Sequence, residues 1–520
     1  MKKLLVMIAL VAAMVCLIGP ASHAEEGNIT WVFDEATGEV TISGSGPMPD
    51  YLYGGYLAPW REAHNYEITR VIIEPGITSI GDYAFSYQSP ISEVVIPEGV
   101  TRIGNYAFLG CSGLTSIRLP ESLTTIGEEA FNGCRDLSSL SLPDGLTSIG
   151  KKAFAECVSL KTIALPAGLT SVGQDVFLAC DRLTHAALPE GLTFLGEGLF
   201  YDCESLVEIK LPSSLTAIGA NALYGCQSLT GIEIPAGVTS IGGGAFADSG
   251  IRAIEVDARN PVYLSDNGIL FSKDRTELVA YPSRGEMAQY LMTNAAQYTI
   301  PAGVTHIGSG AFAGVYYLTD ITIPEGVTHI GEDAFYNTYH LVDFRIPASV
   351  RHIGAGAFTN GEMTAIAVDD ANAYYISDDG VLFTKDYTTL LCFPCAKDAT
   401  TYTIPSGVTR IEARAFQWCS GLTSIETPLS LLTIGDYAFL SCTGLTSLTI
   451  PPYVTEIGEE AFNNCTGIPS IFVPNSVIAI GDNAFGTFNF YTPQIRIRCY
   501  PNSFAHQYAK DHYQNFDTIY

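Results

Sequence analysis

Three histidines recur at a spacing that could support metal chemistry. His306, His329 and His352 follow one another at intervals of 23 residues, each directly before Ile-Gly. Three imidazole nitrogens at about 2.1 Å from one ion form a ligand set that suits zinc or nickel. The same slot holds Ser79 and Thr125 in other copies, so it tolerates polar residues. Two interpretations follow: a metal site, or solvent-exposed histidines duplicated with the repeat.

Cysteines recur at the same interval. The series comprises Cys111, Cys134, Cys157, Cys180, Cys203 and Cys226, followed later by Cys419, Cys442 and Cys465. Neighbouring strands would place their Cβ atoms about 4.8 Å apart, beyond the roughly 3.5 to 4.5 Å of a disulfide. We therefore expect buried thiols that act as small apolar residues.

One further pair, Cys392-Phe-Pro-Cys395, is a lone Cys-x-x-Cys. A zinc site would need a second pair of ligands. We expect a structural role for it, as thiols or as a local disulfide.

Catalytic motifs are absent from the sequence. It contains no Gly-x-Ser-x-Gly, no His-Glu-x-x-His, no phosphate-binding loop and no dinucleotide fingerprint. Acidic pairs such as Glu128-Glu129 fall in a polar turn and are interpreted as surface charge. We predict no catalytic residues, no cofactor and no enzymatic activity.

An Ala-Phe repeat must position all of these residues. Its aromatic position recurs every 23 residues in fifteen copies, with gaps after Phe246 and Phe358 and with Leu223 replacing Phe once. The positions are Phe85, Phe108, Phe131, Phe154, Phe177, Phe200, Leu223 and Phe246, then Phe312, Phe335 and Phe358, then Phe416, Phe439, Phe462 and Phe485. A period of this length indicates a solenoid.

A single copy shows how the pattern encodes one coil. Ile117 and Leu119 alternate with polar residues, which is typical of a strand with one buried face. Pro120 ends that strand because it lacks a backbone donor. Gly127 should permit a tight turn, and Phe131 should enter the core from a short helical or irregular return. We predict a right-handed coil of leucine-rich type with a continuous parallel β-sheet.

The consensus Leu-x-x-Ile-x-Ile-Pro-x-x-Val-Thr-x-Ile-Gly-x-x-Ala-Phe-x-x-Cys resembles that of the BspA-like leucine-rich-repeat family, over about residues 68–485. The resemblance implies a secreted or cell-surface protein. It also implies adhesion to extracellular proteins, such as host matrix or the surface of a neighbouring cell.

The two gaps are copies of one module. Residues 254–282 and 366–394 share Ser-Asp-x-Gly-x-Leu-Phe-x-Lys-Asp-x-Thr-x-Leu. The sequences Asp266-Asn-Gly and Asp378-Asp-Gly favour hairpin turns over calcium loops, because neither supplies the spaced oxygen ligands that calcium requires. Each insert is predicted to be a small β-meander.

The domain organisation follows from these patterns. Met1-Lys-Lys and the apolar run after it predict a signal peptide cut after Ala24. The predicted segments are a signal peptide (1–24), an N-terminal hairpin cap (25–67), repeats (68–253), an insert (254–297), repeats (298–365), an insert (366–402), repeats (403–490) and a C-terminal cap (491–520).

Charge limits the partners. The formal net charge is −28, which repels phosphate backbones and anionic lipid, so we expect neither nucleic acid nor a membrane span after signal cleavage. Outward-facing strand residues form the predicted binding face: Arg118, His185, Glu208, Lys210, Glu233, Asp320, Asp343 and Arg345. A broad polar face suits a protein partner bound through many weak contacts. The alternative hypothesis is a scaffolding component of the cell envelope.

Overall fold

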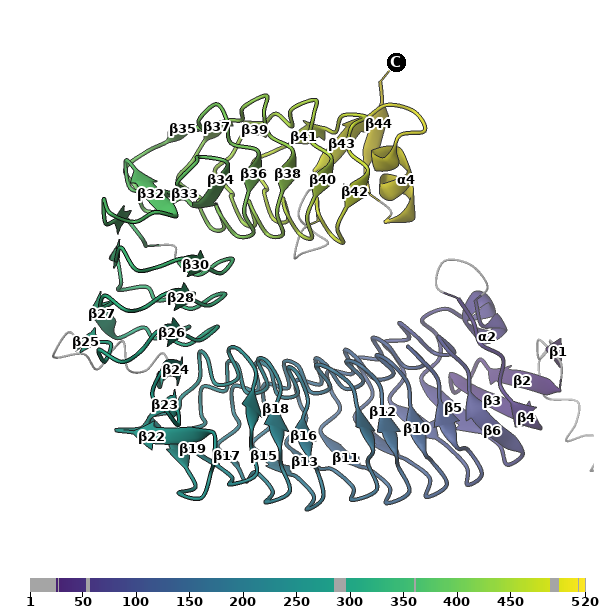
Figure 1. Ribbon diagram of the computed structural model, residues 1–520. Coiled ribbons are helices and arrows are strands. Elements are labelled where there is room, and N and C mark those ends of the chain that lie inside the picture. The colour runs from purple at the N-terminus through teal and green to yellow at the C-terminus, as the bar shows by residue number, and fades with distance from the viewer. Residues whose placement is uncertain are drawn as a thin grey trace, which may run out of the picture. The chain divides into compact units, whose positions relative to one another are not determined.

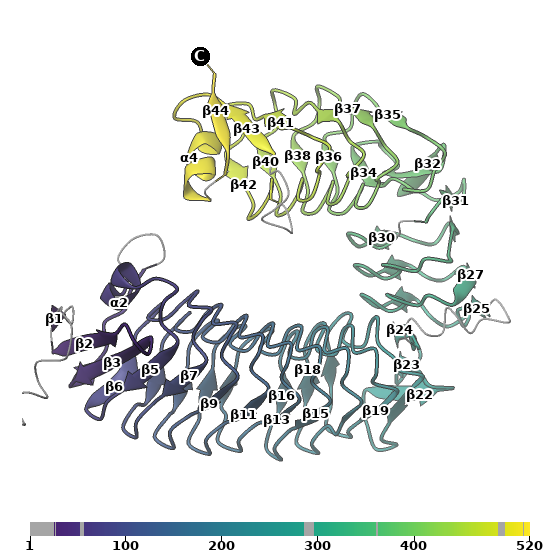
Figure 2. The same cartoon turned by 180° about the vertical axis from the view of Figure 1, so that it is seen from behind.

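The computed structural model describes residues 25–26, 28–52, 57–284, 296–359, 362–486, 495–512 and 514–519. The chain divides into two compact units, Met1–Leu229 and Thr230–Tyr520. Each unit is a solenoid of stacked parallel strands with little helix (Figure 1, Figure 2), so the predicted fold class is confirmed. The predicted signal peptide lies outside the described residues.

The expected column of parallel strands runs through the first unit. Each strand alternates buried and exposed residues, as in Ser116–Arg118, where only Ile117 is buried. Hydrogen bonding is interrupted between β11 and β13, so the column is two sheets and not one continuous ladder. Its strands are β5 (Arg70–Ile73), β7 (Glu93–Val95), β9 (Ser116–Arg118), β11 (Ser139–Ser141), β13 (Thr162–Ala164), β15 (His185–Ala187) and β17 (Glu208–Ile209).

A second column of parallel strands was not predicted. The Thr-x-Ile-Gly segment, expected to be a turn, forms two-residue strands, and Ile126 pairs with Ile149 of the next coil. This column comprises β6 (Ile77–Ile80), β8 (Arg102–Ile103), β10 (Thr125–Ile126), β12 (Ser148–Ile149), β14 (Ser171–Val172), β16 (Phe194–Leu195) and β18 (Ala217–Ile218).

The repeated glycine after this second strand has a different role from the one predicted. Gly127 and Gly150 do not have a positive φ, so they are not needed for a left-handed turn. A Cβ on Gly150 would lie 2.4 Å from the backbone nitrogen of Glu128 in the preceding coil. Glycine is therefore required there by the close approach of two backbones.

The return segment is irregular and carries the core. Its backbone amides donate to the next coil, as from Phe131 to the Ala153 carbonyl at 2.8 Å. The phenylalanines point inward and stack, with centroids 5.2 Å apart for Phe108 and Phe131 and 5.4 Å for Phe131 and Phe154. Stacked aromatic rings and backbone ladders together join each coil to the next.

The first coil is covered by a short N-terminal structure. A hairpin of β2 (Ile29–Asp34) and β3 (Glu39–Gly44) continues the first column by pairing with β5. β4 (Gly46–Pro47) continues the second column, and β1 (Glu25–Glu26) pairs with β2. Helix α2 (Pro59–Ala63) places Trp60 on Phe85 at 5.4 Å, and the indole nitrogen donates to the Ala84 carbonyl. Trp60 therefore closes the aromatic column.

The second unit repeats this arrangement. Its first column comprises β19 (Gly231–Ile234), β21 (Ala253–Val256), β25 (Ala296–Thr299), β27 (Leu318–Thr322), β29 (Asp343–Ile346), β31 (Ala365–Val368), β35 (Thr401–Thr403), β37 (Ser424–Glu426), β39 (Ser447–Leu448) and β41 (Ser470–Phe472). Its second column comprises β20 (Ser240–Ile241), β24 (Glu277–Ala280), β26 (His306–Ile307), β28 (His329–Ile330), β30 (His352–Ile353), β34 (Thr389–Cys392), β36 (Arg410–Ile411), β38 (Thr433–Ile434), β40 (Glu456–Ile457) and β42 (Ala479–Ile480).

Both inserts are enlarged coils. In the first, β22 (Tyr263–Asp266), β23 (Ile269–Ser272) and β24 form the predicted meander, and β24 then pairs in parallel with β26. Tyr281 enters the aromatic column and stacks on Phe312 at 5.1 Å. In the second, β32 (Tyr375–Asp378), β33 (Val381–Thr384) and β34 do the same, with Phe393 on Phe416. Each insert thus contributes a strand to both columns and a ring to the core.

A half-buried ion pair spans coils on either side of the second insert. Arg414 Nε lies 3.2 Å from Asp333 Oδ1, and its guanidinium packs against the rings of Tyr336 and Tyr437. Gly356 lies between the two charged side chains, where a Cβ would be 2.2 Å from Asp333 Oδ1. Burial raises the pKa of Asp333 to about 6, and Arg414 opposes that rise.

The last coil is closed by strand and helix. β43 (Arg496–Cys499) pairs with β41 and with β44 (Phe516–Thr518). Ser503 caps α4 (Phe504–Asp511) by accepting the amide of His506. Tyr508 of α4 contacts Phe485 edge to face at 6.2 Å and accepts the amide of Ala484.

Candidate functional site

The three histidines lie in register on the second column of the second unit. His306 pairs with His329 and His329 with His352, while Glu277 of the first insert pairs with His306. The rings of His306 and His329 stack with centroids 4.4 Å apart and planes 13° apart. The rings of His329 and His352 are 5.7 Å apart and tilted by 41°.

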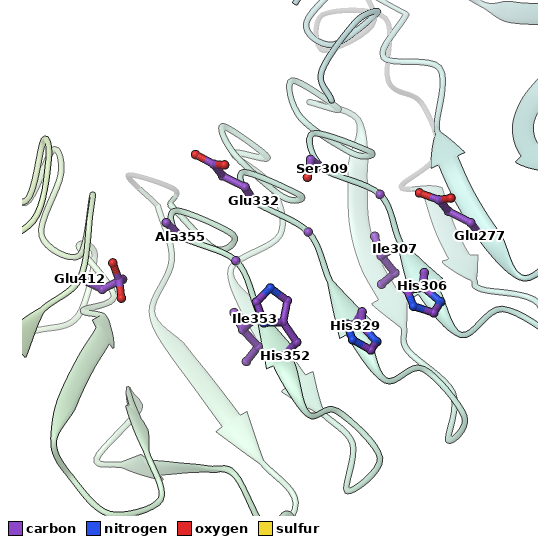
Figure 3. A pocket seen from close by; sticks show the side chains of 13 residues that line it. Glu277, His306, Ile307, Ser309, His329, Glu332, His352, Ile353, Ala355 and Glu412 are labelled. Atoms are coloured by element: carbon purple, nitrogen blue, oxygen red, sulfur yellow. The ribbon is translucent and has the colours of Figure 1, made fainter. Parts of the chain in front are cut away.

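This column forms one side of a groove with a volume of about 580 Å³ (Figure 3). All three imidazoles are exposed. Figure 3 shows Glu277 beside His306 at one end and Glu412 at the other. The lining residues are Glu277, His306, Ile307, Gly308, Ser309, His329, Gly331, Glu332, His352, Ile353, Gly354, Ala355 and Glu412.

Contacts with threonine hydroxyls indicate the tautomer of two of the rings. Thr305 Oγ1 donates to the Thr276 carbonyl across the ladder, and His306 Nδ1 lies 2.8 Å from the same oxygen. A hydroxyl has one hydrogen, so with that hydrogen on the Thr276 carbonyl we assign Nδ1 as the donor to Thr305. His329 and Thr328 repeat this geometry. In the neutral rings, Nε2 therefore carries a lone pair directed away from the ladder.

The charges in the groove are negative. Its lining includes three carboxylates, those of Glu277, Glu332 and Glu412, and none of the described lining residues is Lys or Arg. Arg410 pairs with Glu412 at 3.1 Å beside the groove. Burial lowers the pKa of His329, and repulsion from the two neighbouring histidines and Arg351 lowers it further.

No group of three or more acidic, histidine or cysteine side chains in the described parts of the chain is arranged to hold a metal ion. The reason is the ladder itself. In-register strands stack the imidazoles like steps, so their nitrogens point in parallel and do not converge. The predicted three-histidine site is not assembled in the observed side-chain conformations.

The predicted strand-face residues are all exposed, but they belong to different units. Arg118, His185, Glu208 and Lys210 lie on the first unit, and Glu233, Asp320, Asp343 and Arg345 lie on the second. On the second unit, Arg345 pairs with Asp369 at 3.4 Å. The eight residues remain a predicted face and not one assembled site.

Arg118 lines a smaller groove of about 430 Å³ between β7 and β9. Its acidic neighbours are already occupied: Glu93 binds Arg70, and Glu98 accepts the backbone amides of Glu121 and Ser122. The Arg118 guanidinium has no hydrogen-bond or ion-pair partner among the described residues. It stands beside Val95, which is 39% exposed.

The cysteine prediction is correct for most positions and wrong for one. Cys111 and the other cysteines of the first series are free and buried, and the Cys111 thiol donates to the Phe85 carbonyl. Burial raises the pKa of Cys111 to about 12. Cys419, however, forms a disulfide with Cys395, whose Cα lies 4.4 Å away. Cys395 follows Pro394 in the insert, outside the regular ladder slot, so the strand spacing used for the prediction does not apply.

The acidic residues of the histidine groove were not predicted. Glu277 was detectable, because the insert aligns Thr276-Glu277-Leu278 with Thr305-His306-Ile307. Glu412 was not detectable, because a second insert separates it in sequence from the histidines.

In the described residues, no helix is long and apolar enough to cross a membrane.

Comparisons with known proteins identify the class. The family model for the BspA type leucine rich repeat region matches residues 63–180, 147–264, 285–379 and 391–507, well over half of the chain. The chain belongs to this leucine-rich-repeat family. No curated protein matches the sequence.

Several solved structures are similar to this chain. A leucine-rich repeat protein from Eubacterium ventriosum is 25% identical, with 86% of this chain and 95% of that chain covered and a TM-score of 0.37. One from Bacteroides ovatus is 23% identical, with coverage of 96% and 100% and a TM-score of 0.38. A leucine rich cell surface protein from Faecalibacterium prausnitzii is 24% identical, with coverage of 82% and 94% and a TM-score of 0.40.

Proposed function

We propose that this chain is a secreted or cell-surface protein that binds other proteins through exposed strand faces, without catalysis. The observation that supports this most is the first column of the first unit. From β9 to β15, its outward residues are exposed and mostly small and polar: Ser116, Ser139, Ser141, Thr162, Ala164 and Ala187. A flat polar surface on a hydrogen-bonded frame suits a protein partner better than a small substrate.

The charged residues at the ends of this surface provide specificity. Arg118 has no ion-pair or hydrogen-bond partner among the residues that the structure describes, while His185, Glu208 and Lys210 are exposed near the other end. Unpaired surface charges that meet complementary charges on a partner steer association and set orientation. The family membership and the strongly acidic composition support an extracellular protein partner over nucleic acid.

The experiment compares two variants with the same change in net charge. Residues 25–520 are immobilised, and extracellular proteins that bind saturably are identified by mass spectrometry. The face variant carries Arg118→Glu and Lys210→Glu, and the control carries Lys151→Glu and Lys152→Glu on the return segment. We expect the face variant to lose at least tenfold in affinity, which is about 1.4 kcal/mol, and the control to bind as the parent does.

Two outcomes would contradict the proposal. Equal losses in both variants would show that only overall charge matters. The absence of any saturable partner would favour the alternative of a scaffold in the cell envelope.

A further inference from the structure

The imidazoles of His306 and His329, which are neighbours in the histidine groove, have hydrogen bonds typical of metal ligands. In metal sites, the ring nitrogen that does not bind the ion donates to a fixed acceptor, which orients the ring and leaves the other nitrogen as the ligand. His306 and His329 already make this outer bond, through Nδ1 to Thr305 and Thr328. Both hydroxyls are in turn held by ladder carbonyls. Each Nε2 lone pair is therefore free to bind an ion, and the two rings need only tilt toward each other to share one.

The surroundings favour a cation. The groove contains the carboxylates of Glu277 and Glu332, and Glu277 is in register beside His306. No Lys or Arg is among its described lining residues, and the whole chain carries a net charge of −28. Such a field concentrates cations near the groove.

We propose that His306 and His329 together bind one divalent transition-metal ion of the zinc, nickel or copper class through their Nε2 atoms. Water completes the coordination shell, because the described residues supply no group of three converging ligands. The ion is thus held at an open, exchangeable surface site and not in a closed structural one. Nitrogen ligands exclude calcium and magnesium, which prefer oxygen.

The distance between the rings of His306 and His329 is compatible with their binding one ion together. The two rings are 4.4 Å apart and nearly parallel. A shared ion requires the two exposed rings to tilt toward each other by small rotations about χ1 and χ2 that keep the Nδ1 contacts with Thr305 and Thr328. His352 is set apart by its longer 5.7 Å spacing and by Arg351, which stands where the other two have threonine. It lacks the threonine bond that fixes its neighbours.

The chain supplies two matched controls. His352 lies on the same groove next to His329. His185 of the first unit is exposed and makes the same Nδ1 contact, at 2.9 Å to Thr184, but its register neighbours are Thr162 and Glu208. If His306 and His329 bind the ion as a pair, substitution of His352 or His185 should leave the metal affinity unchanged.

The test is calorimetric titration of residues 25–520, without an affinity tag, with ZnCl₂ and NiCl₂ at pH 7.5. We expect His306→Gln and His329→Gln each to weaken one binding event by about tenfold or more. His352→Gln and His185→Gln should leave it unchanged. Thr328→Val, which keeps both imidazoles and removes the outer bond, should weaken it by about tenfold.

A second measurement guards against indirect effects. With ¹³C-labelled histidine, zinc should shift the ring signals of two of the eight histidines in residues 25–520, and each pair variant should lack one of these two signals. Unchanged zinc affinity in His306→Gln or His329→Gln would overturn the proposal, as would equal losses in the control variants. The metal site would stand even if the strand face of the first unit bound no partner.

Discussion

Gly150 shows how one hydrogen atom in place of a methyl group allows the coils to stack. Its missing Cβ would meet backbone atoms of the previous coil, and Gly127 and Gly173 are in the same position. Flexible side chains can move away from such a contact, but a backbone that is hydrogen-bonded on both sides cannot. The glycine of each repeat therefore sets the distance between coils, and not only the shape of a turn.

Gly150→Ala should destabilise the first unit by about 2 kcal/mol or more, because the added methyl forces two ladders apart. Gly303→Ala is the control, since its Cβ would have no neighbour within 4 Å and its φ is not positive. That change should be neutral or slightly stabilising. Urea denaturation followed by circular dichroism measures both, and similar midpoints for the two variants would refute the close-approach explanation.

Asp333 makes stability depend on pH. Its folded pKa of about 6 exceeds the ordinary value of 3.8, so the folded state holds the proton more tightly. Below about pH 4 the Asp333 carboxyl therefore does not reduce the free energy of unfolding. As the pH rises toward 6, it reduces that free energy more and more. Relative to Asp333→Asn, the parent should lose about 2 kcal/mol of stability between pH 4.5 and 7.5.

Thermal unfolding of the two proteins at both pH values tests this expectation, because all other titrating groups are common to them. If the difference in stability between the parent and Asp333→Asn did not change with pH, Arg414 would be keeping Asp333 ionised at both pH values. The Arg414 ion pair and its two tyrosines would then outweigh burial.

At the scale of the elements, the disulfide joins the second insert to the coil that follows it. Cys395 belongs to the return of the insert, and Cys419 to the return of the next repeat. Replacing both by serine should lower stability by about 3 to 4 kcal/mol, as expected for a loop of this length. Mass spectrometry of non-reduced peptides should find this link and leave Cys111 and Cys134 as thiols. A link between ladder cysteines would contradict the structure.

The first strand column and the aromatic core could be predicted, because each rests on a strong local pattern. Ile117 and Leu119 alternate with polar residues, and Phe131 recurs without a slip. The second column escaped prediction because strands such as Thr125–Ile126 have two residues, too few to show a period. Trp60 could not be assigned as a cap, since nothing in its own segment indicates that it stacks on Phe85.

For the candidate site, the sequence predicted where the histidines lie but not the contacts that surround them. The 23-residue interval placed the histidines side by side, and the ladder then determined that they stack and do not converge. The hydrogen bonds from the rings to Thr305 and Thr328 depend on side-chain rotamers. The contribution of Glu412 depends on how the chain returns after the insert. Neither can be read from spacing.

At the scale of the whole molecule, the ladders of the first unit join each coil to the next one, so damage there should remain local. Trp60→Ala removes the ring that covers Phe85 and should cost about 3 to 5 kcal/mol at that end. Hydrogen exchange should accelerate most in β5 to β8 and progressively less toward β14. Residues 403–486 of the second unit should be unaffected. Uniform acceleration along the chain would show a single cooperative unit instead.

The uniform register of the ladders also has a consequence for how such a gene changes. Ser148 pairs with Thr125 and with Ser171, and each partner lies 23 residues away. Removing residues 128–150 would join Gly127 to Lys151 and bring Thr125–Ile126 beside Ser171–Val172, which is a strand of the same kind. Recombination between copies can therefore shorten or lengthen the protein by whole coils, and each product keeps the register of the second column at the new junction.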